Sequence, residues 1–281
     1  MLTEDDVAAC NAPVSLVMTN GTSDVLGTAT DCITTLVNGA SVIDSPGVAA
    51  ATLASLNTVA GGGANLTQSS AKQLVDALST VASAVISGGA STGTADQTNA
   101  LLQSVVAGSN AVAASLLAGL SAAPVNASAP PPRIVFSTQN FQMALTVGPM
   151  SLTAPISVNG SAAAFSPLPA AATANASNSL GSTFASFAFN PYPAPNASAG
   201  TGNVTAGSSA ATSSQVSTSG MVRLALSDGG QPFPVHNLSM PILFNMTVVN
   251  QTSGRGTSCR RGQGLLECGE LLPRSCCLGK P

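Results

Sequence analysis

The residues of this sequence best suited to chemistry are asparagines that stand two positions before a serine or threonine. Ten of the eighteen asparagines begin such an Asn-x-Ser/Thr sequon, and none of the ten is followed by proline. Their side-chain amides can accept an N-linked oligosaccharide in a secretory compartment. The ten are Asn20, Asn65, Asn126, Asn159, Asn175, Asn196, Asn203, Asn237, Asn245 and Asn250. We expect these sites to be glycosylated; the alternative is that a chain rich in Ser and Thr produces sequons by composition alone.

The six cysteines fall into two groups, one at each end of the chain. The first group is Cys10 and Cys32, and the second is Cys259, Cys268, Cys276 and Cys277. An even number of cysteines in a sequon-rich chain predicts disulfides. We expect Cys10 to pair with Cys32 and so to join two successive helices, and we take Cys259 and Cys268 as further disulfide candidates. The second group has no Cys-x-x-Cys pair and no nearby histidine, which argues against a zinc site.

Catalytic motifs are missing from the sequence. Its one histidine, His236, directly precedes a sequon, and no Gly-x-Ser-x-Gly elbow, phosphate-binding loop or dinucleotide fingerprint occurs. The cluster Glu4-Asp5-Asp6 suits the first turn of a helix better than a calcium site. We therefore predict no enzyme activity, no cofactor and no metal. A pair of carboxylates brought together by the fold, as in a glycosidase, stays open as an alternative.

The low content of charged residues bears on the cellular compartment of the chain. Only 7% of its residues are Asp, Glu, Lys or Arg, against about 25% in an ordinary soluble protein. Glycans could provide the missing surface polarity. The N-terminal residues 1–6 are acidic and lack the apolar core of a signal peptide, and no stretch reaches the ~18 apolar residues of a membrane span. We expect a piece of a longer ectodomain, on the extracellular side of a membrane or secreted; a cytosolic protein with accidental sequons is the alternative.

Hydrophobic periodicity predicts helices in the first part of the chain, which has no aromatic residue before Phe136. Apolar residues recur at helical spacing and are bounded by capping residues and glycines. The expected helices run from Thr3 to a kink or end at Pro13, over about 23–37, 45–60 and 67–87, and from Thr94 to before Pro124. Together they define an Ala-rich helical subdomain over 1–128.

Alternation of apolar and polar residues predicts strands over 133–250. The clearest case is 221–250, where Val222, Leu224 and Leu226 alternate before the turn 228–230 and a second alternating run follows. We predict a hairpin or meander with one buried face there, and a disordered insert at about 190–218.

The last residues, 251–281, change character. The body, 1–254, has three basic and nine acidic residues, whereas the remainder has five basic and two acidic residues. We predict an unstructured tail; a phosphate-binding arm is the alternative. The fold class expected for the whole chain is α+β: an N-terminal Ala-rich helical subdomain, an antiparallel β-sandwich-like subdomain and a disordered tail.

Three segments after the helical part resemble a known family when taken in order. They are RIVFSTQNFQMAL at 133–145, NGSAAAFSPLP at 159–169 and VRLALSDGGQPFPVHNLSMPILFNMTV at 222–248. Together with the helices they are similar to the REJ-like ectodomain region of polycystin-1-type proteins and of the sea-urchin sperm receptor for egg jelly, especially the Ala-rich forms of green algae. The resemblance covers roughly 20–250 and implies a GAIN-like module, helices then a β-sandwich, that precedes a proteolysis motif.

The chain departs from that family at the proteolysis motif. It contains no Trp, and His236 is followed by Asn237 instead of the Leu-Ser/Thr of a cleavage site. Autoproteolysis is therefore not predicted. The resemblance implies a non-catalytic extracellular module of a membrane protein, for adhesion, mechanical coupling or contact with a protein or glycan ligand, with no nucleic-acid partner and with membrane contact only through other parts of the gene product. A secreted cell-wall or matrix glycoprotein is the alternative.

Overall fold

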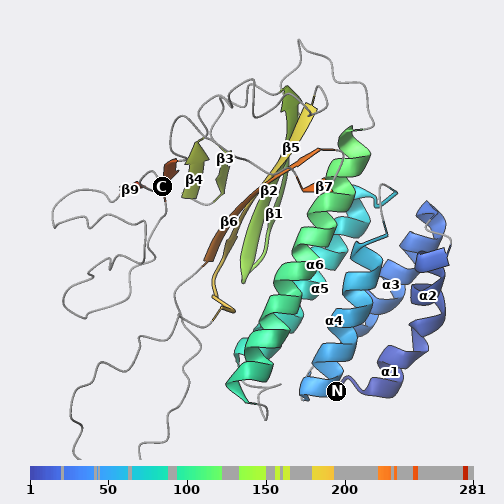
Figure 1. Ribbon diagram of the computed structural model, residues 1–281. Helices are drawn as coiled ribbons and strands as arrows, with labels where there is room; N and C mark the ends of the chain where they lie inside the picture. Colours follow the sequence, from blue (N-terminus) through green and yellow to red (C-terminus); the bar gives the residue numbers. More distant parts are fainter. Residues whose placement is uncertain are drawn as a thin grey trace, which may run out of the picture. The chain divides into compact units, whose positions relative to one another are not determined.

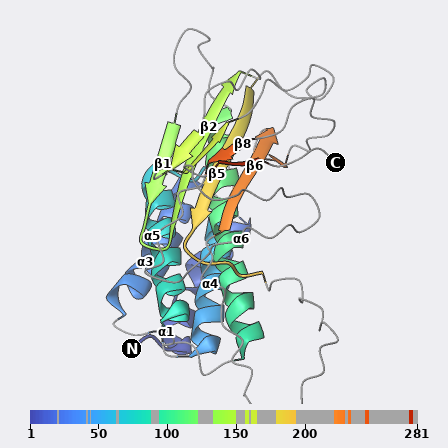
Figure 2. The same ribbon diagram turned by 90° about the vertical axis from the view of Figure 1, so that its left-hand side faces the viewer.

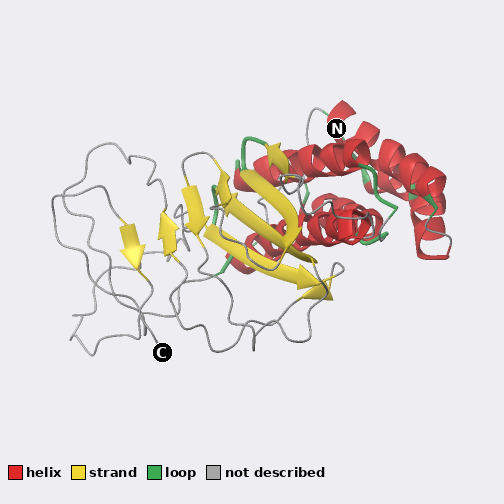
Figure 3. Cartoon of the chain, turned by 90° about the horizontal axis from the view of Figure 1, so that it is seen from above, coloured by secondary structure: helices red, strands yellow, loops and turns green. Residues whose placement is uncertain are grey.

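The computed structural model of the chain has an α+β fold, built of helices and strands (Figure 3). Among the residues it describes, all helices precede all strands along the chain. This confirms the expected fold class. The described residues are 1–19, 22–40, 43, 45–62, 65–87, 94–121, 133–149, 156–158, 161–164, 179–192, 221–228, 231–232, 243–245 and 275–277. Most of the expected insert at 190–218 and most of the tail 251–281 lie outside them.

The helical part agrees closely with the periodicity of the sequence (Figure 1). The helices are α1 (Glu4–Ala9), α2 (Asn11–Thr19), α3 (Ser23–Gly39), α4 (Pro46–Ala60), α5 (Gln68–Ile86) and α6 (Ala95–Ser121). The apolar residues at helical spacing in α3 to α6 are all buried except Leu36 and Leu120, which are half-buried. The buried ones are Leu26, Ala29, Ile33, Val37, Leu53, Leu56, Val59, Leu74, Val75, Leu78, Val81, Val85, Leu101, Leu102, Val105, Val112, Leu116 and Leu117.

The expectation for Pro13 was wrong in its position. The break between α1 and α2 falls at Cys10, which caps α1, and Pro13 lies in the first turn of α2. Proline is tolerated there because the first turn of a helix has no carbonyl partners for its N–H groups. The first expected helix is thus two helices, and the break is set at Cys10 instead of at the proline.

Side-chain caps define where the helices begin. The Thr3 hydroxyl accepts a hydrogen bond from Asp6 N (3.2 Å), and Asp6 Oδ2 accepts one from Thr3 N (2.9 Å), which makes a capping box. Thr94 and Gln97 form the same arrangement before α6, as their spacing predicts. Ser45 caps α4 with Pro46 at its first position.

The helices pack closely where small residues lie between them. Helix α3 packs on α2, α4 and α5, and α4 also packs on α1, α2 and α5 (Figure 1). Gly108 of α6 faces α4 and α5: a Cβ added to it would overlap Asn57 Oδ1 and lie 2.9 Å from Leu78 Cδ2. The Asn57 amide donates to the carbonyl oxygen of Ser104 (3.2 Å). Close packing of this kind suits the Ala- and Gly-rich sequence.

Helix α6 alone among the described helices is long and apolar enough to cross a membrane. The window Asp96–Leu120 has a mean hydropathy of 1.5, and 61% of it is buried inside the protein. A largely buried helix of this kind is also typical of a protein core.

The strands form two sheets. Their bounds are β1 (Arg133–Ser137), β2 (Phe141–Pro149), β3 (Ile156–Val158), β4 (Ser161–Ala164), β5 (Ser179–Phe187), β6 (Met221–Asp228), β7 (Gln231–Pro232), β8 (Leu243–Asn245) and β9 (Ser275–Cys277). Among the described strands, one sheet has the order β1-β2-β5-β6-β7 and the other has the order β3-β4-β8-β9. Strands β1, β2, β5 and β6 of the first sheet lie side by side (Figure 2). Strand β9 lies in the tail for which the sequence analysis expects no regular structure.

Alternation of apolar and polar residues predicts the burial pattern of the edge strand β1 better than that of the inner strand β2. In β1, Ile134 and Phe136 are buried and the residues between them are exposed. In β2 every residue from Met143 to Val147 is buried, and the Thr146 hydroxyl bonds that of Ser182 on β5 at 2.6 Å. An inner strand covered on both faces loses the alternation that marks a half-exposed strand.

The predicted hairpin at 221–250 was only half right. Strand β6 turns back into β7, with Asp228 opposite Gln231, as the Asp-Gly-Gly turn predicts. The second run does not pair with β6: its strand β8 belongs to the other sheet, between β4 and β9. Alternation reveals a strand but carries no information about its neighbour.

The chain divides into two compact units that alternate along the sequence. The first holds Met1–Leu116, Thr138–Phe141 and Phe187–Met221, and the second holds Leu117–Ser137, Gln142–Ser186 and Val222–Pro281. In the first unit the rings of Phe141 and Phe187 lie 5.3 Å apart, and Ala188 N donates to Asn140 O (2.8 Å). These contacts join the two later segments of the first unit to each other.

Candidate functional site

Asn65 is the one sequon asparagine whose side chain lies among the described residues. It is exposed, in the turn between α4 and α5. Asn245 is the last residue of β8, in a segment described by its backbone. The other eight lie outside the described residues: Asn20, Asn126, Asn159, Asn175, Asn196, Asn203, Asn237 and Asn250. An exposed asparagine in a turn is where an attached glycan can point into solvent.

The rest of the Asn65 sequon is built into the start of α5. Leu66 is buried, with 6% of its surface exposed. Thr67 is the N-cap of the helix: its hydroxyl accepts a hydrogen bond from Ser70 N (3.1 Å) and donates one to Ser70 Oγ (3.0 Å). The sequon therefore presents its asparagine outward, while its apolar residue and its hydroxyl are used by the fold.

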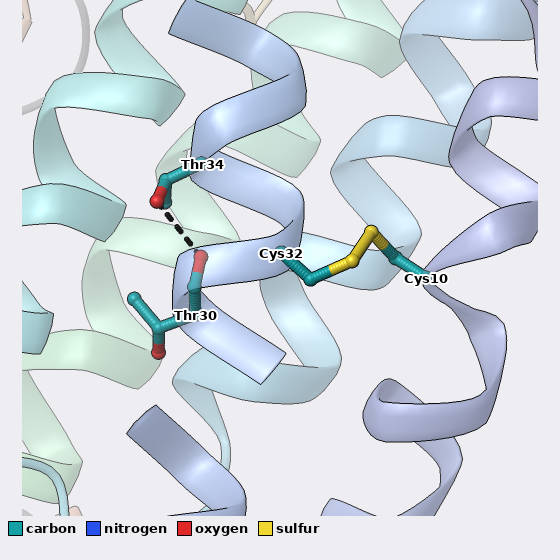
Figure 4. Close-up of a disulfide and its surroundings, with 4 residues drawn as sticks. All are labelled: Cys10, Thr30, Cys32 and Thr34. Atoms are coloured by element: carbon teal, nitrogen blue, oxygen red, sulfur yellow. Dashed lines mark hydrogen bonds between the residues drawn. A yellow bond between two sulfur atoms is a disulfide. The ribbon is translucent and has the colours of Figure 1, made fainter. Parts of the chain in front are cut away.

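Cys10 and Cys32 form the disulfide that the sequence predicts (Figure 4). Their Cα atoms are 5.9 Å apart, within the range that a disulfide spans. Cys10 is fully buried and Cys32 is half-buried. The bond joins the end of α1 to the middle of α3, not two successive helices, because α2 lies between them.

The disulfide lies among helices, and buried residues of α3 lie near it in the sequence. Along α3, Thr30 and Thr34 are buried, and the Thr34 hydroxyl donates to the carbonyl oxygen of Thr30 (2.8 Å; Figure 4). Ile33, next to Cys32, is fully buried. A crosslink between packed helices is suited to stabilising their packing.

The remaining cysteine candidates are not placed by the described residues. Cys259 and Cys268 lie outside them, whereas Cys276 and Cys277 belong to β9, opposite Phe244 and Leu243. Cys259 and Cys268 therefore stay predicted disulfide candidates.

Groups that could do acid–base or metal chemistry are dispersed in the described part of the chain. It contains no cluster of three or more His, Cys, Asp or Glu side chains able to hold a metal ion. The pKa of Asp6 lies below its ordinary value, first because the Thr3 hydroxyl bonds its carboxylate and then because the Thr3 backbone N–H does so. That shift belongs to a helix cap on the surface. His236 lies outside the described residues.

One buried polar contact was not foreseen from the sequence. Asn140, at 8% exposure, donates from Nδ2 to the carbonyl oxygen of Ser79 (2.7 Å) and lies 2.6 Å from Ser83 Oγ. The segment Thr138-Gln139-Asn140 between two strand patterns signals a turn. Nothing in it signals that its amide is received by serines of α5.

Comparison with known proteins gives no assignment: no family model matches the chain, and no curated protein matches it significantly.

Proposed function

We propose that this chain is a non-catalytic extracellular module of a polycystin/REJ-like membrane protein, which serves adhesion, mechanical coupling or contact with an extracellular protein or glycan. The observation that carries the proposal is the Cys10–Cys32 disulfide within the helical unit. Structural disulfides persist in oxidising compartments and are rare in the cytosol. A buried crosslink between α1 and α3 is therefore what a secretory-pathway protein would contain.

Two further features support an extracellular role. Asn65 begins a sequon and is exposed on the helical unit. Only 7% of the residues are charged, fewer than soluble proteins usually carry, and N-linked glycans would add hydrophilic surface. The resemblance of 133–145, 159–169 and 222–248 to REJ-like ectodomains points to a membrane protein of that type.

A second candidate, a secreted cell-wall or matrix glycoprotein, is favoured by composition. The chain is rich in Ala, Ser, Thr, Gly and Pro, and the 190–218 stretch lacks any charged residue. Such composition is common in secreted, heavily glycosylated chains. Both candidates share the disulfide and the glycans, so the difference between them is whether the gene product stays with a membrane.

The proposal is tested on the natural gene product in its own cells, with an antibody against the helical region. The product should fractionate with membranes, and external protease should remove the epitope from intact cells. Recovery of the epitope from the medium or wall alone would favour the second candidate. A cytosolic, protease-protected product would contradict both.

A further inference from the structure

We infer that Asn65 is glycosylated before helix α5 forms, so that folding of the α5 N-terminus closes this sequon to further modification. The inference rests on the proposed function in that the chain must meet the glycosylation machinery of a secretory compartment. It goes beyond it in fixing the order of modification and folding at one named site. It is carried by the positions of Asn65, Leu66 and Thr67 in the folded chain.

The reaction joins the side-chain amide nitrogen of Asn65 to the anomeric carbon of an oligosaccharide. The donor is a polyprenyl-diphosphate-linked oligosaccharide; its bond between the anomeric carbon and oxygen breaks as the new carbon–nitrogen bond forms. The polyprenyl diphosphate leaves, and the amide loses one proton. The transferase reads the sequon in a groove and binds the hydroxyl of the residue two positions after the asparagine.

In the folded chain the Asn65 sequon does not have the unbonded hydroxyl that the transferase binds. The Thr67 hydroxyl is committed to Ser70, from whose N–H it accepts at 3.1 Å and to whose Oγ it donates at 3.0 Å. Leu66, the middle residue, is 6% exposed. A transferase could bind Thr67 only if the first turn of α5 opened and Leu66 left its contacts. Because opening costs free energy, the native chain should be a poor acceptor.

The finished glycan is nevertheless compatible with the fold, because Asn65 itself is exposed in the turn. The sequon is therefore open to modification before folding and accommodates the product after folding. A sequon that is inaccessible at every stage would carry no glycan, whereas this sequon can be modified before folding and can keep its glycan afterwards.

Synthesis leaves time for this order. Helix α5 has 19 residues, and an isolated helix of that length is marginal without its packing partners. The packing partners α3 and α4 precede α5 in the chain, so the helix can form once its last residue, Ile86, has been made, 19 residues after Thr67. At roughly 5–20 residues per second, these take about 1–4 s to be made. During that time the Thr67 hydroxyl is available to the transferase.

The test compares native and unfolded forms of the full chain as substrates. The chain is produced unglycosylated in a bacterial periplasm and given to purified oligosaccharyltransferase with lipid-linked donor, either native or after reduction and unfolding. Occupancy of Asn65 is read by peptide mass spectrometry. Modification at the other nine sequons reports that enzyme and donor are active, and circular dichroism reports that the native sample is helical. We expect Asn65 to be modified at least about tenfold more slowly in the native chain.

Two variants sharpen the comparison. Ser70→Pro, in the first turn of α5, removes both the N–H and the hydroxyl that bond Thr67, and should raise the rate at which Asn65 is modified in the native chain. Ser69→Ala, at an exposed neighbouring position, should leave the native rate unchanged. Equal rates for native and unfolded wild-type chain would overturn the inference, as would failure to modify Asn65 in the unfolded chain while other sequons are modified. Neither result depends on where the natural protein resides, so the proposed function is judged separately.

Discussion

The disulfide between Cys10 and Cys32 crosslinks the end of α1 to the middle of α3, and the whole of α2 lies between the two cysteines in the sequence. Cys10 is at once the C-cap of α1 and a fully buried residue. The short N-terminal helices are thus tied to α3, which also packs on α4 and α5. This links the redox state of the chain to the stability of its helical unit.

Replacing both cysteines with serine is expected to destabilise the helical unit. The bond closes a loop with a sequence separation of 22, and loss of such a constraint raises the entropy of the unfolded chain by an amount worth about 3 kcal/mol. Urea unfolding followed by circular dichroism measures the change. The Cys10→Ser/Cys32→Ser variant should also lose sensitivity to reductant in the helical signal; unchanged stability would show that the bond contributes nothing.

Asn140 should be needed for the stability of the unit that contains the helices. Asn140→Ala removes the buried amide that bonds Ser79 and Ser83 and leaves the buried carbonyl oxygen of Ser79 without that partner, at a cost of about 1–3 kcal/mol. The adjacent Gln139 is exposed, so Gln139→Ala is the matched control and should change stability by less than about 0.5 kcal/mol. Equal midpoints of thermal unfolding for the two variants would contradict this role.

Alanine should have opposite effects at two helical glycines. At Gly108 a Cβ would overlap Asn57 Oδ1 and press on Leu78, so Gly108→Ala should cost about 1–3 kcal/mol through overpacking. At Gly27 in α3 nothing lies within 4 Å of the added carbon. Gly27→Ala should therefore stabilise by up to about 1 kcal/mol through helix propensity. Chemical denaturation of both variants checks the sign, and stabilisation by Gly108→Ala would refute the close α4–α6 contact.

Acid should weaken the first capping box. Hydrogen bonds from Thr3 favour the charged form of Asp6, so the folded-state pKa lies below the ordinary value of 3.8. The contribution to stability is therefore present above about pH 3.8 and is lost as the pH falls through the lower, folded-state pKa. NMR titration should give Asp6 a lower pKa in the wild type than in Thr3→Ala. Identical titration curves would mean that the box does not form in solution.

The sequence predicted the helices and strands better than it predicted which of them contact one another. The stripe Leu74, Leu78 and Val85 of α5 and the Thr94–Gln97 capping box follow from local spacing, and both are present. The break at Cys10 was misplaced to Pro13 because the sequence alone does not distinguish a proline that ends a helix from one that begins the next.

Contacts distant along the chain explain the other differences. The amide of Asn140 meets α5 residues 57 and 61 positions earlier, and β8 pairs with β4 and β9 instead of β6. Neither contact leaves a periodic trace in the sequence, since both depend on the tertiary arrangement. The Cys10–Cys32 pairing could be predicted because only those two cysteines lie in the helical part.

The most direct test of the account is peptide mapping of the full chain, produced behind a signal peptide through a eukaryotic secretory pathway. Non-reducing digestion with mass spectrometry reports the Cys10–Cys32 bond and the occupancy of Asn65 in the same sample. The account predicts a disulfide-linked peptide pair and an N-linked glycan on Asn65 of the secreted, folded chain. A folded product with both cysteines free and no glycan on any sequon would contradict an extracellular glycoprotein module.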